Sequence, residues 1–573
     1  MINLTIDGQK VEVEQGATIL QAARKAKIHI PTLCYLDEVQ AIGACRVCLV
    51  EVEGNRALQA SCVFPASEGL VVHTTTARVR KARKFAVEML LSNHPMDCLT
   101  CDRNLNCELQ KIASELGIRE VRFTGQMSKG GIDEGSPSLR RNQNKCILCR
   151  RCVTVCQNVQ TVTALFAQGR GFESKVAPAF DASINDVACA NCGQCSLVCP
   201  VGAITEKSSI EGVWEALADP TKFVVVQEAP AVRAALGEEF GYPAGTLVTG
   251  KMLSAVRRLG FDRIFDTNFT ADLTIIEEGN ELIKRIKESG TLPIITSCSP
   301  GWIKFIEHFY PSLLPHLSTC KSPQQMLGAL AKTYFAEKEG LNPKDMVVVS
   351  VMPCTAKKFE CERPEMTDSG YKDVDFVLTT RELARMIREA GIDFNNLPDG
   401  EYDAPMGEYT GAGTIFGATG GVMEAALRTA YEVLTGKTLA DLDFHGVRGL
   451  KGIKEATVPI EGVGDVKVAV AHGLGNARKL MERLKKGEAN YHFIEVMACP
   501  GGCVGGGGQP IPVNSEIRTA RAEALYAEDR GMPKRKSHEN PSVTRVYEEY
   551  LKNPLGEKSH HLLHTKYKAR EVH

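Results

Sequence analysis

The sequence lacks the features that mark membrane, exported and nucleic-acid-binding proteins. Its 573 residues contain no apolar run of about 20 residues, and Met1 leads directly into an alternating strand pattern instead of a signal-like segment. The formal net charge is only −1, so the composition does not point to a nucleic acid or an anionic membrane as partner. We therefore expect a soluble, cytoplasmic protein without nucleic-acid or membrane contacts.

A dinucleotide-binding loop is also missing. No G-x-G-x-x-G motif follows any predicted strand, and Gly417–Gly421 (GATGG) is too short to serve as such a loop. We therefore do not expect the chain itself to bind a nicotinamide or flavin cofactor.

Cysteine, by contrast, is abundant, with 21 residues in the chain. Thiols stay reduced in the cytosol, so a disulfide framework of this size would be unusual there. The cysteines also fall into close-spaced sets, which favours metal clusters. Because the chain is too long for one hydrophobic core, we expect several domains, each built around such a set.

One stretch combines cysteine with glycine in a special way. In Glu495–Pro510 (EVMACPGGCVGGGGQP), Cys499 and Cys503 stand among six glycines after a short apolar run. Glycine in ordered structure costs conformational entropy, so such a tract suits a backbone that must approach a bulky, rigid group closely. Thiolates at this spacing suit an iron–sulfur cluster. Residues alone thus predict a tightly wrapped, cysteine-ligated metal cluster.

Residues 1–78 are predicted to form a small domain with one cysteine set. Ile2–Ile6 alternates apolar and polar residues, Asp7-Gly8 predicts a hairpin turn, and a helix is expected over Ala17–Ala26. This order resembles the β-grasp fold of plant-type [2Fe–2S] ferredoxins. The resemblance implies one [2Fe–2S] cluster on Cys34, Cys45, Cys48 and Cys62. Four cysteines also suit tetrahedral zinc, which remains the alternative.

Residues 79–137 are predicted to form a second module. An amphipathic helix over Val79–Leu91 precedes a set of one imidazole and three thiolates, namely His94, Cys98, Cys101 and Cys107. The set resembles the [4Fe–4S] module with one histidine and three cysteine ligands found in hydrogenases and in the large iron–sulfur subunit of respiratory complex I. A nitrogen ligand leaves the cluster less negative and should shift its potential.

Residues 138–209 carry the most specific cofactor signal. A C-x-x-C-x-x-C-x-x-x-C run occurs twice, as Cys146, Cys149, Cys152 and Cys156 and again as Cys189, Cys192, Cys195 and Cys199. This is the two-cluster ferredoxin run, in which the fourth cysteine of each motif ligates the other cluster. We expect Cys199 to join the first three of the earlier set and Cys156 the first three of the later one. One [2Fe–2S] and three accessory [4Fe–4S] clusters would then form an electron wire.

From Phe223 the composition changes, and residues 210–520 are predicted to form the largest domain. Apolar runs begin at Phe223 and recur at Pro293–Thr296, Met346–Val351 and Val466–Ala471, with helical stretches at Gln325–Glu339 and Arg381–Ala390 between them. This pattern predicts parallel sheets covered by helices. The whole chain is thus expected to be a multidomain protein of α/β and α+β parts.

Three loops of this domain carry a family resemblance. TSCSPGW (Thr296–Trp302), MPCTAKKFE (Met352–Glu360) and the glycine-rich stretch resemble the signature loops of the catalytic subunit of [FeFe]-hydrogenases. The resemblance implies an H-cluster, which is a [4Fe–4S] cubane joined through a cysteine sulfur to a two-iron site with CO, cyanide and a dithiolate bridge. It implies reversible H2 oxidation and proton reduction by an enzyme of anaerobic metabolism.

The family's ligand positions fall on Ser299, Cys354, Cys499 and Cys503, and Cys503 matches the bridging cysteine. The family has a cysteine where Ser299 stands, and Cys298 matches its proton relay. Serine is a poorer iron ligand than thiolate because its intrinsic pKa is much higher. Alternatively Cys298 turns to the cubane, or the serine is an engineered replacement.

The resemblance also implies residues around the two-iron site. Lys357 matches a lysine that donates to cyanide, and further pocket positions fall on Pro230, Ser322, Pro323, Gln324, Met352 and Met497. Ala231 stands where some members have a serine. The family's proton path falls on Glu278, Glu281, Arg285 and Ser318, the first three of which share one face of a predicted helix.

Residues 521–573 are predicted to pack on the catalytic domain or on a partner subunit. This tail resembles that of hydrogenase subunits in NAD(P)-linked complexes, so ferredoxin or flavin- and NAD(P)-binding subunits are the expected partners. His560, His561 and His564 are interpreted as packing or subunit contacts, and Cys320 and Cys361 as structural thiols. Two rival functions remain: an electron-transfer subunit of complex I type, and a low-activity sensory homologue.

Overall fold

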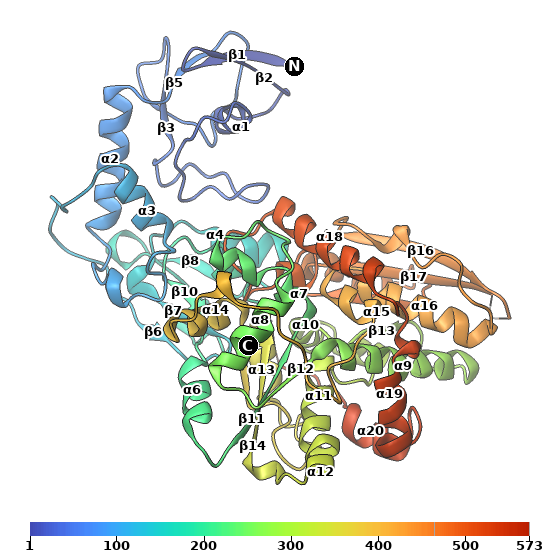
Figure 1. Ribbon diagram of the computed structural model, residues 1–573. Coiled ribbons are helices and arrows are strands. Elements are labelled where there is room, and N and C mark those ends of the chain that lie inside the picture. Colours follow the sequence, from blue (N-terminus) through green and yellow to red (C-terminus); the bar gives the residue numbers. More distant parts are fainter. Residues whose placement is uncertain (463, 572–573) are drawn as a thin grey trace.

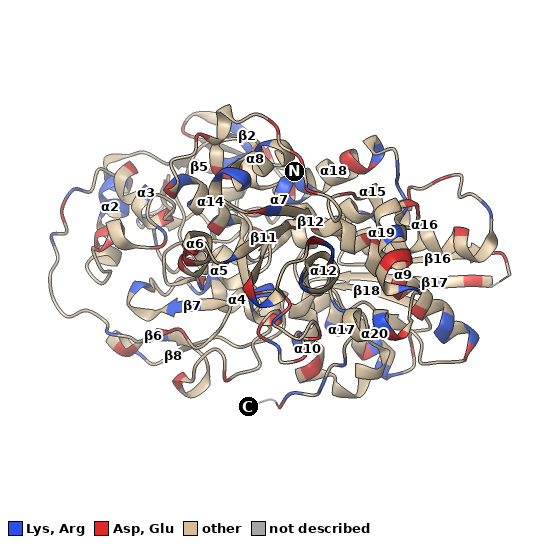
Figure 2. Ribbon diagram, turned by 60° about the horizontal axis from the view of Figure 1, so that its bottom comes forward, with Lys and Arg blue, Asp and Glu red and all other residues tan. Residues whose placement is uncertain are grey.

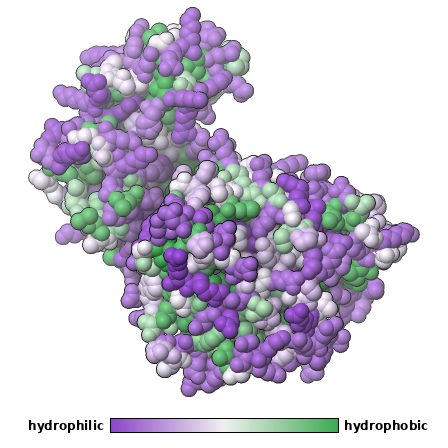
Figure 3. Space-filling view, viewed as in Figure 1, coloured by the Kyte–Doolittle hydropathy of each residue, from purple (hydrophilic) through white to green (hydrophobic). Residues whose placement is uncertain are grey.

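The computed structural model describes residues 1–462 and 464–571 (Figure 1). A small N-terminal lobe stands apart from a larger body, and helix α2 (Ala77–Leu91) leads from one toward the other. The space-filling view shows the same waist between lobe and body (Figure 3). Among the described residues, no helix is both long and apolar enough to cross a lipid bilayer.

The N-terminal lobe is a five-stranded mixed sheet with the order β2-β1-β5-β3-β4, and one helix packs against it. Asp7 and Gly8 both have positive φ, as a two-residue hairpin turn requires, which confirms the predicted turn. A capping box between Thr18 and Gln21 starts the helix. The elements are β1 (Ile2–Ile6), β2 (Gln9–Val13), α1 (Ile19–Lys25), β3 (Leu49–Val52), β4 (Gln59–Ala60) and β5 (Val71–His73).

The next two modules are rich in loops, because most of their backbone surrounds the cysteine sets. Each cysteine run leads into a short helix through one residue with a left-handed backbone, Arg150 before α4 and Gly193 before α5, so the repeated sequence gives a repeated local structure. The elements are α3 (Glu108–Glu115), β6 (Ile132–Asp133), β7 (Leu139–Asn142), α4 (Arg151–Thr154), β8 (Phe166–Gln168), β9 (Lys175–Ala177), α5 (Gln194–Val198) and β10 (Ile204–Glu206).

Two four-stranded sheets form the centre of the body. The first has the order β12-β11-β14-β15 and is entirely parallel. The second has the order β13-β18-β17-β16, and only β16 runs antiparallel to its neighbour. The prediction of parallel sheets is therefore confirmed with one exception. The strands are β11 (Phe223–Glu228), β12 (Arg263–Asp266), β13 (Ile294–Ile295), β14 (Met346–Met352), β15 (Phe376–Thr379), β16 (Ile453–Ile460), β17 (Gly464–His472) and β18 (Phe493–Met497).

Helices cover both sheets, as the alternation of apolar runs and helical stretches predicted. They are α6 (Ile210–Ala218), α7 (Pro230–Arg233), α8 (Thr249–Leu259), α9 (Thr267–Lys287), α10 (Pro300–Phe309), α11 (Pro323–Leu330), α12 (Ala336–Glu339), α13 (Ala356–Glu360), α14 (Thr380–Glu389), α15 (Gly411–Thr414), α16 (Gly421–Thr435) and α17 (Leu474–Lys485). Many charged residues lie on these helices (Figure 2), and several of them, such as Glu278, Arg381 and Arg428, are buried.

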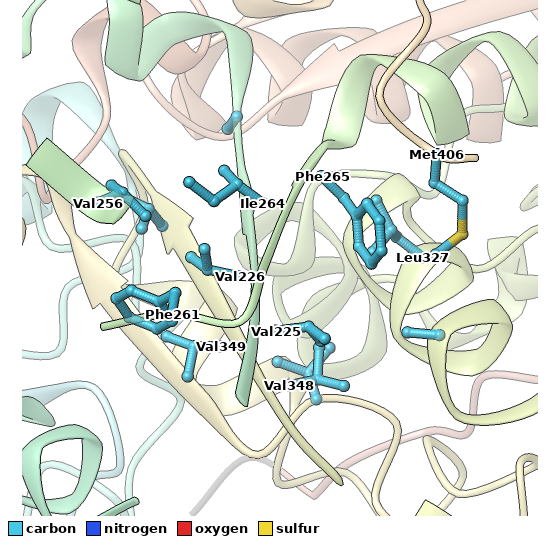
Figure 4. Close-up of a cluster of buried hydrophobic side chains, with 14 of the residues drawn as sticks. Val225, Val226, Val256, Phe261, Ile264, Phe265, Leu327, Val348, Val349 and Met406 are labelled. Carbon is cyan, nitrogen blue, oxygen red and sulfur yellow. The ribbon is translucent and has the colours of Figure 1, made fainter. Parts of the chain in front are cut away.

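The core of the first sheet is made of β-branched residues from neighbouring parallel strands. Val225 and Val226 of β11 lie beside Val348 and Val349 of β14 and point to opposite faces of the sheet, and Phe265 of β12 lies on the face of Val225 and Val348 (Figure 4). All five are buried. Such continuous apolar strands are typical of a parallel sheet covered on both faces.

The tail folds onto the body through α18 (Ser515–Gly531), α19 (Pro541–Val546) and α20 (Glu557–Leu563). The domain boundary expected after residue 520 falls inside α18, and the one expected after residue 78 falls inside α2. Both helices join the parts that the sequence pattern separated.

Candidate active site and iron–sulfur sites

The four cysteines of the N-terminal lobe converge. The Cys34 thiol lies within hydrogen-bonding range of Cys45 and Cys62, and Cys48 lies within range of Cys62. None of the four forms a disulfide, and three of them are buried. Four free thiols that converge in this way fit the ligand set of a small metal cluster.

The eight cysteines of the ferredoxin-like module lie in two spatial groups. Cys199 is an electrostatic neighbour of Cys146, Cys149 and Cys152. Cys156 is a neighbour of Cys189, Cys192 and Cys195. Each group of four thiols therefore combines residues from both runs.

The set with one imidazole is more open. His94, Cys98 and Cys107 line one pocket, and Cys101 lies near Cys107. The Nδ1 atom of His94 is buried and has no hydrogen-bond partner within the described structure. A buried ring nitrogen without a partner is costly, so its position beside three thiols fits a nitrogen ligand of a metal cluster.

The sets are connected by short polar contacts. The side-chain amide of Gln40 donates both to the Cys34 carbonyl at 2.6 Å and to the Cys149 carbonyl at 2.9 Å. The Glu108 amide donates to the Pro200 carbonyl at 2.9 Å and thereby joins the loop after Cys107 to the loop after Cys199. Two outer sets thus contact the same ferredoxin-like cluster site, so the chain of sites is branched.

A cavity of about 80 Å³ lies where the carboxyl ends of the two central sheets face each other. The loops that follow the parallel strands β11, β13, β14 and β18 reach it, together with other segments. The wall is mainly apolar. It includes Cys298, Ser299, Cys354, Cys499, Cys503, Lys357, Pro230, Pro323, Gln324, Met352 and Met497, all predicted site residues. Cys354, Cys499 and Cys503 are electrostatic neighbours of one another.

The glycine tract wraps this cavity because no side chain would fit there. A Cβ atom on Gly506 would lie 2.1 Å from the Pro353 carbonyl oxygen, and one on Gly507 would lie 2.5 Å from the Cys192 carbonyl oxygen. Gly501 and Gly502 have φ of 84° and 91°, which L-residues with side chains rarely adopt. The expected close backbone approach is therefore present.

Cys298 and Ser299 face different neighbours. Cys298 lies near Glu278 and Lys357, and burial raises the pKa of its thiol well above the usual range. The Ser299 hydroxyl oxygen accepts a hydrogen bond from the Ala498 amide at 3.2 Å, one residue before Cys499. The serine side chain therefore points toward the Cys499 loop.

A row of carboxylates leads from Cys298 outward along α9. Glu278 and Glu281 are buried, and burial raises the pKa of Glu278 to about 8. The Ser318 hydroxyl donates to Glu281 at 3.2 Å and also hydrogen-bonds Glu278. Arg285 donates to Glu281 at 2.5 Å, and its side chain is 15% exposed. The helix face predicted for proton transfer is thus buried at one end and solvent-accessible at the other.

Comparison with known proteins agrees with this geometry. The family described as the C-terminal domain of the iron-only hydrogenase large subunit matches residues 222–507. The NADP-reducing hydrogenase subunit HndD of Solidesulfovibrio fructosivorans is 53% identical over 583 aligned positions, covering 100% of this chain and 99% of that protein. The chain belongs to the [FeFe]-hydrogenase family.

Other relatives of this hydrogenase support the assignment. Iron hydrogenase 1 of Clostridium pasteurianum is 44% identical across 99% of this chain and 100% of its own. The structure of an apo HydA1 [FeFe]-hydrogenase variant from Chlamydomonas reinhardtii matches with a TM-score of 0.57 and 46% identity, covering 64% of this chain and 100% of that one.

Four further families match the remaining segments of the hydrogenase. They are a [2Fe–2S] cluster binding domain (1–77), the NADH-ubiquinone oxidoreductase-G iron–sulfur region (83–122), a 4Fe–4S dicluster domain (145–203) and the iron hydrogenase small subunit (515–570). The chain is therefore an [FeFe]-hydrogenase with accessory iron–sulfur domains. The complex I resemblance is confined to one segment, so the alternative of a non-hydrogenase electron-transfer subunit gains no support.

One predicted pocket residue of the hydrogenase lies behind the cavity wall. Ser322 does not line the cavity, and its hydroxyl donates to the Glu360 carboxylate at 2.9 Å. Gln324 and Lys357 donate to the same oxygen at 3.1 and 2.9 Å. The sequence reasoning missed Glu360, although it ends the MPCTAKKFE loop, because two of its three partners, Ser322 and Gln324, lie more than 30 residues away.

Cys192 is a second residue that the sequence did not place at the active site. It belongs to the ferredoxin-like module, yet it lines the catalytic cavity and is an electrostatic neighbour of Cys354. The last accessory cluster site of the hydrogenase therefore adjoins the catalytic one. Only the fold could show this contact.

The tail reaches the proton path through His564. Its Nδ1 lies 2.8 Å from the Thr319 hydroxyl, which also donates to Glu281 at 3.1 Å. Its Nε2 lies 3.1 Å from Glu277. His564 is buried, as the packing interpretation requires, whereas His560 and His561 are exposed. Cys320 and Cys361 are buried, in agreement with structural roles.

Proposed function

We propose that this chain catalyses reversible H2 oxidation and proton reduction at an H-cluster held by Ser299, Cys354, Cys499 and Cys503. One observation carries the proposal: three thiols, Lys357 and Cys298 meet in an apolar cavity that also adjoins an accessory cluster site. A non-catalytic cluster protein has no need of such a cavity beyond its last cubane. The converging free thiols and the close glycine wrap fit a bulky iron–sulfur group.

The bound cofactor supplies Lewis-acid activation and heterolytic cleavage of H2. The protein residues position the cofactor, exclude water from it and transfer protons. Lys357, oriented by Glu360 and by the Cys298 carbonyl at 3.2 Å, offers a cationic donor to an anionic cyanide. Pro230, Pro323, Met352 and Met497 keep water out of the cavity.

Protons travel along the row of Cys298, Glu278, Ser318 and Glu281. A pKa of about 8 keeps Glu278 protonated at neutral pH, so that it holds a proton beside the Cys298 thiol. The Ser318 hydroxyl can accept a proton from one carboxyl group and pass its own to the next. Arg285 holds Glu281 at the solvent end of the row.

The four accessory sites would hold one [2Fe–2S] and three [4Fe–4S] clusters, which would supply a path for electrons. The [2Fe–2S] site and the site with His94 form two branches, which meet at the site of Cys146, Cys149, Cys152 and Cys199. The site of Cys156, Cys189, Cys192 and Cys195 lies between that site and the catalytic cavity. The branch point rests on the contacts of Gln40 and of Glu108.

The chain works within a multi-subunit complex linked to NAD(P) or ferredoxin. HndD is named an NADP-reducing hydrogenase subunit, and the tail matches the small-subunit family. No dinucleotide loop was found in the sequence, so partner subunits would bind the nucleotide. We expect the purified chain alone not to reduce NAD(P)+.

Infrared spectroscopy of the matured protein tests the proposal, because CO and cyanide bands fall in an otherwise empty spectral window. Iron analysis of reconstituted protein without the two-iron site should give about 18 irons per chain, from one [2Fe–2S] cluster and four cubanes. A value near four irons, or stoichiometric zinc, would contradict the electron wire. The absence of both band types after maturation would contradict the H-cluster and favour a non-catalytic homologue.

A further inference from the structure

An open cleft at the waist of the molecule has no part in the proposed mechanism. It has a volume of about 970 Å³ and lies between α2, the loop after Cys45 and the loop around Ile147. Cys45 and Cys149 both line it. These cysteines belong to two different cluster sites, the [2Fe–2S] site and the branch-point cubane site. A molecule in this cleft would lie beside both.

Helix α2, which forms one wall of the cleft, is unusually basic in its N-terminal half, where positive charge is unfavourable. Five cations occupy its first half: Arg78, Arg80, Lys81, Arg83 and Lys84. No acidic residue lies in its first turn. The N-terminal end of a helix dipole disfavours positive charge, so this arrangement weakens the helix. A role in binding an anionic surface explains it better than a role in folding.

The cations that line the cleft are partly uncompensated. Arg78 and Arg122 pair with Glu51 and Glu88, which do not line the cleft. Arg46 and Lys81 form no ion pair with any described residue. No lining residue in the described parts of the chain is acidic. The Lys and Arg positions along the α2 ribbon are coloured blue in Figure 2.

The backbone at Arg46 has an unusual conformation that keeps its side chain exposed. Its φ is 58°, a left-handed conformation that a non-glycine residue rarely adopts. Arg46 directly follows the cluster ligand Cys45, so this turn places a guanidinium group at the edge of the [2Fe–2S] site. Strain of this kind persists where the surrounding structure imposes it and is common at binding sites.

Apolar side chains lie among these cations. Lys81, Phe85 and Met89 follow one another at intervals of four residues on one face of α2, and all three line the cleft. Phe85 is 50% exposed and Met89 is 38% exposed. An apolar centre with a charged rim is the composition of a protein–protein interface.

We propose that this basic cleft, defined by Arg46, Arg78, Lys81, Phe85, Met89 and Arg122, is the docking surface for a redox protein with carboxylates around its cofactor. The proposal rests on the proposed function, and it names where electrons are exchanged. One electron passes from the reduced partner to the adjacent cluster, without any bond being formed or broken. The charge of the cleft selects an acidic partner and speeds its approach.

The test compares two electron donors with the fully loaded enzyme. H2 production is measured with an acidic [2Fe–2S] ferredoxin and, separately, with methyl viologen, a small cation that needs no protein-sized docking surface. For Lys81→Glu, the KM for ferredoxin should rise roughly tenfold or more at low ionic strength when rates are normalised to the viologen-linked rate. In the unchanged enzyme, this KM should rise with salt as screening shortens the Debye length to about 8 Å at physiological ionic strength.

Lys10→Glu provides the matched control, because it makes the same charge change on β2, at the edge of the sheet opposite to β3 and β4. Its KM for ferredoxin should change less than about twofold. Phe85→Ser should raise the KM without changing its dependence on salt. Equal effects of Lys81→Glu and Lys10→Glu, or a KM that is insensitive to salt, would overturn the docking surface. If the unchanged enzyme produced no H2 even with viologen, the proposed function would fail instead.

Discussion

The contact between the tail and α9 predicts a measurable loss of local stability. His564 reaches Glu277 and Thr319, and Glu277 also accepts hydrogen bonds from Tyr547, Ser559 and the Leu555 amide. His564→Ala removes one of four groups that hold this buried carboxylate. Breaking a buried pair usually costs 3–5 kcal/mol, but three donors remain here, so we expect a loss of about 2–3 kcal/mol.

Native-state hydrogen exchange of the tail measures this loss directly, because it reports local opening in a protein too large for a single unfolding transition. At 1.36 kcal/mol per factor of ten, exchange of amides in α20 should be roughly 30- to 150-fold faster in His564→Ala. His560→Ala is the matched control. The His560 ring stacks on that of His564 at 4.8 Å, but His560 is exposed and does not contact Glu277.

The outcome decides whether His564 anchors the tail on α9. If both variants exchange at similar rates, within about threefold, His564 does not anchor the tail and the reasoning is wrong. If only His564→Ala opens, H2 turnover of the same variant shows whether the Thr319 hydroxyl must be held beside Glu281 for proton transfer.

Three further predictions concern the active site. Cys298→Ala should reduce turnover at least about 100-fold while leaving iron content and infrared bands intact, since it removes a proton donor; loss of iron would instead make Cys298 a ligand. Ser299→Cys should lengthen the lifetime of the cubane and change the bias between H2 oxidation and proton reduction in film voltammetry, because thiolate is the softer donor; equal lifetimes and bias would remove position 299 from the ligand set. Burial keeps Glu278 protonated below its pKa of about 8, so H2 production should fall as pH rises through about 8; Glu278→Gln should lower the rate at least about 100-fold and abolish that inflection.

The cluster sites could be predicted from the sequence because the ligands of each run lie close together in it. Cys146 to Cys156 and Cys189 to Cys199 each lie within one short loop and helix, and the crossed grouping of Cys199 and Cys156 follows from the motif. The central strands were readable as well, since a buried parallel strand must be apolar throughout. The fold of the tail was not predicted. A domain boundary was placed inside α18 because this helix has no strong apolar stripe.

Contacts between distant segments could not be predicted from the sequence. Glu277 and His564 are 287 residues apart, and Gln194 donates to the Gly505 carbonyl across 311 residues. No local pattern marks such partners. Glu278 and Glu281 were predicted only because the family resemblance supplied them; the helix pattern alone shows a charged face, and its burial depends on how Ser318 and the tail cover it.

The glycine wrap has a consequence for how the enzyme is made. Gly506 and Gly507 press against the Pro353 and Cys192 carbonyls, so a side chain at either position would push the loop away from its neighbours. One of these carbonyls belongs to the catalytic domain and the other to the ferredoxin-like module. The glycine loop can therefore reach its final packing only after the two parts of the chain have come together.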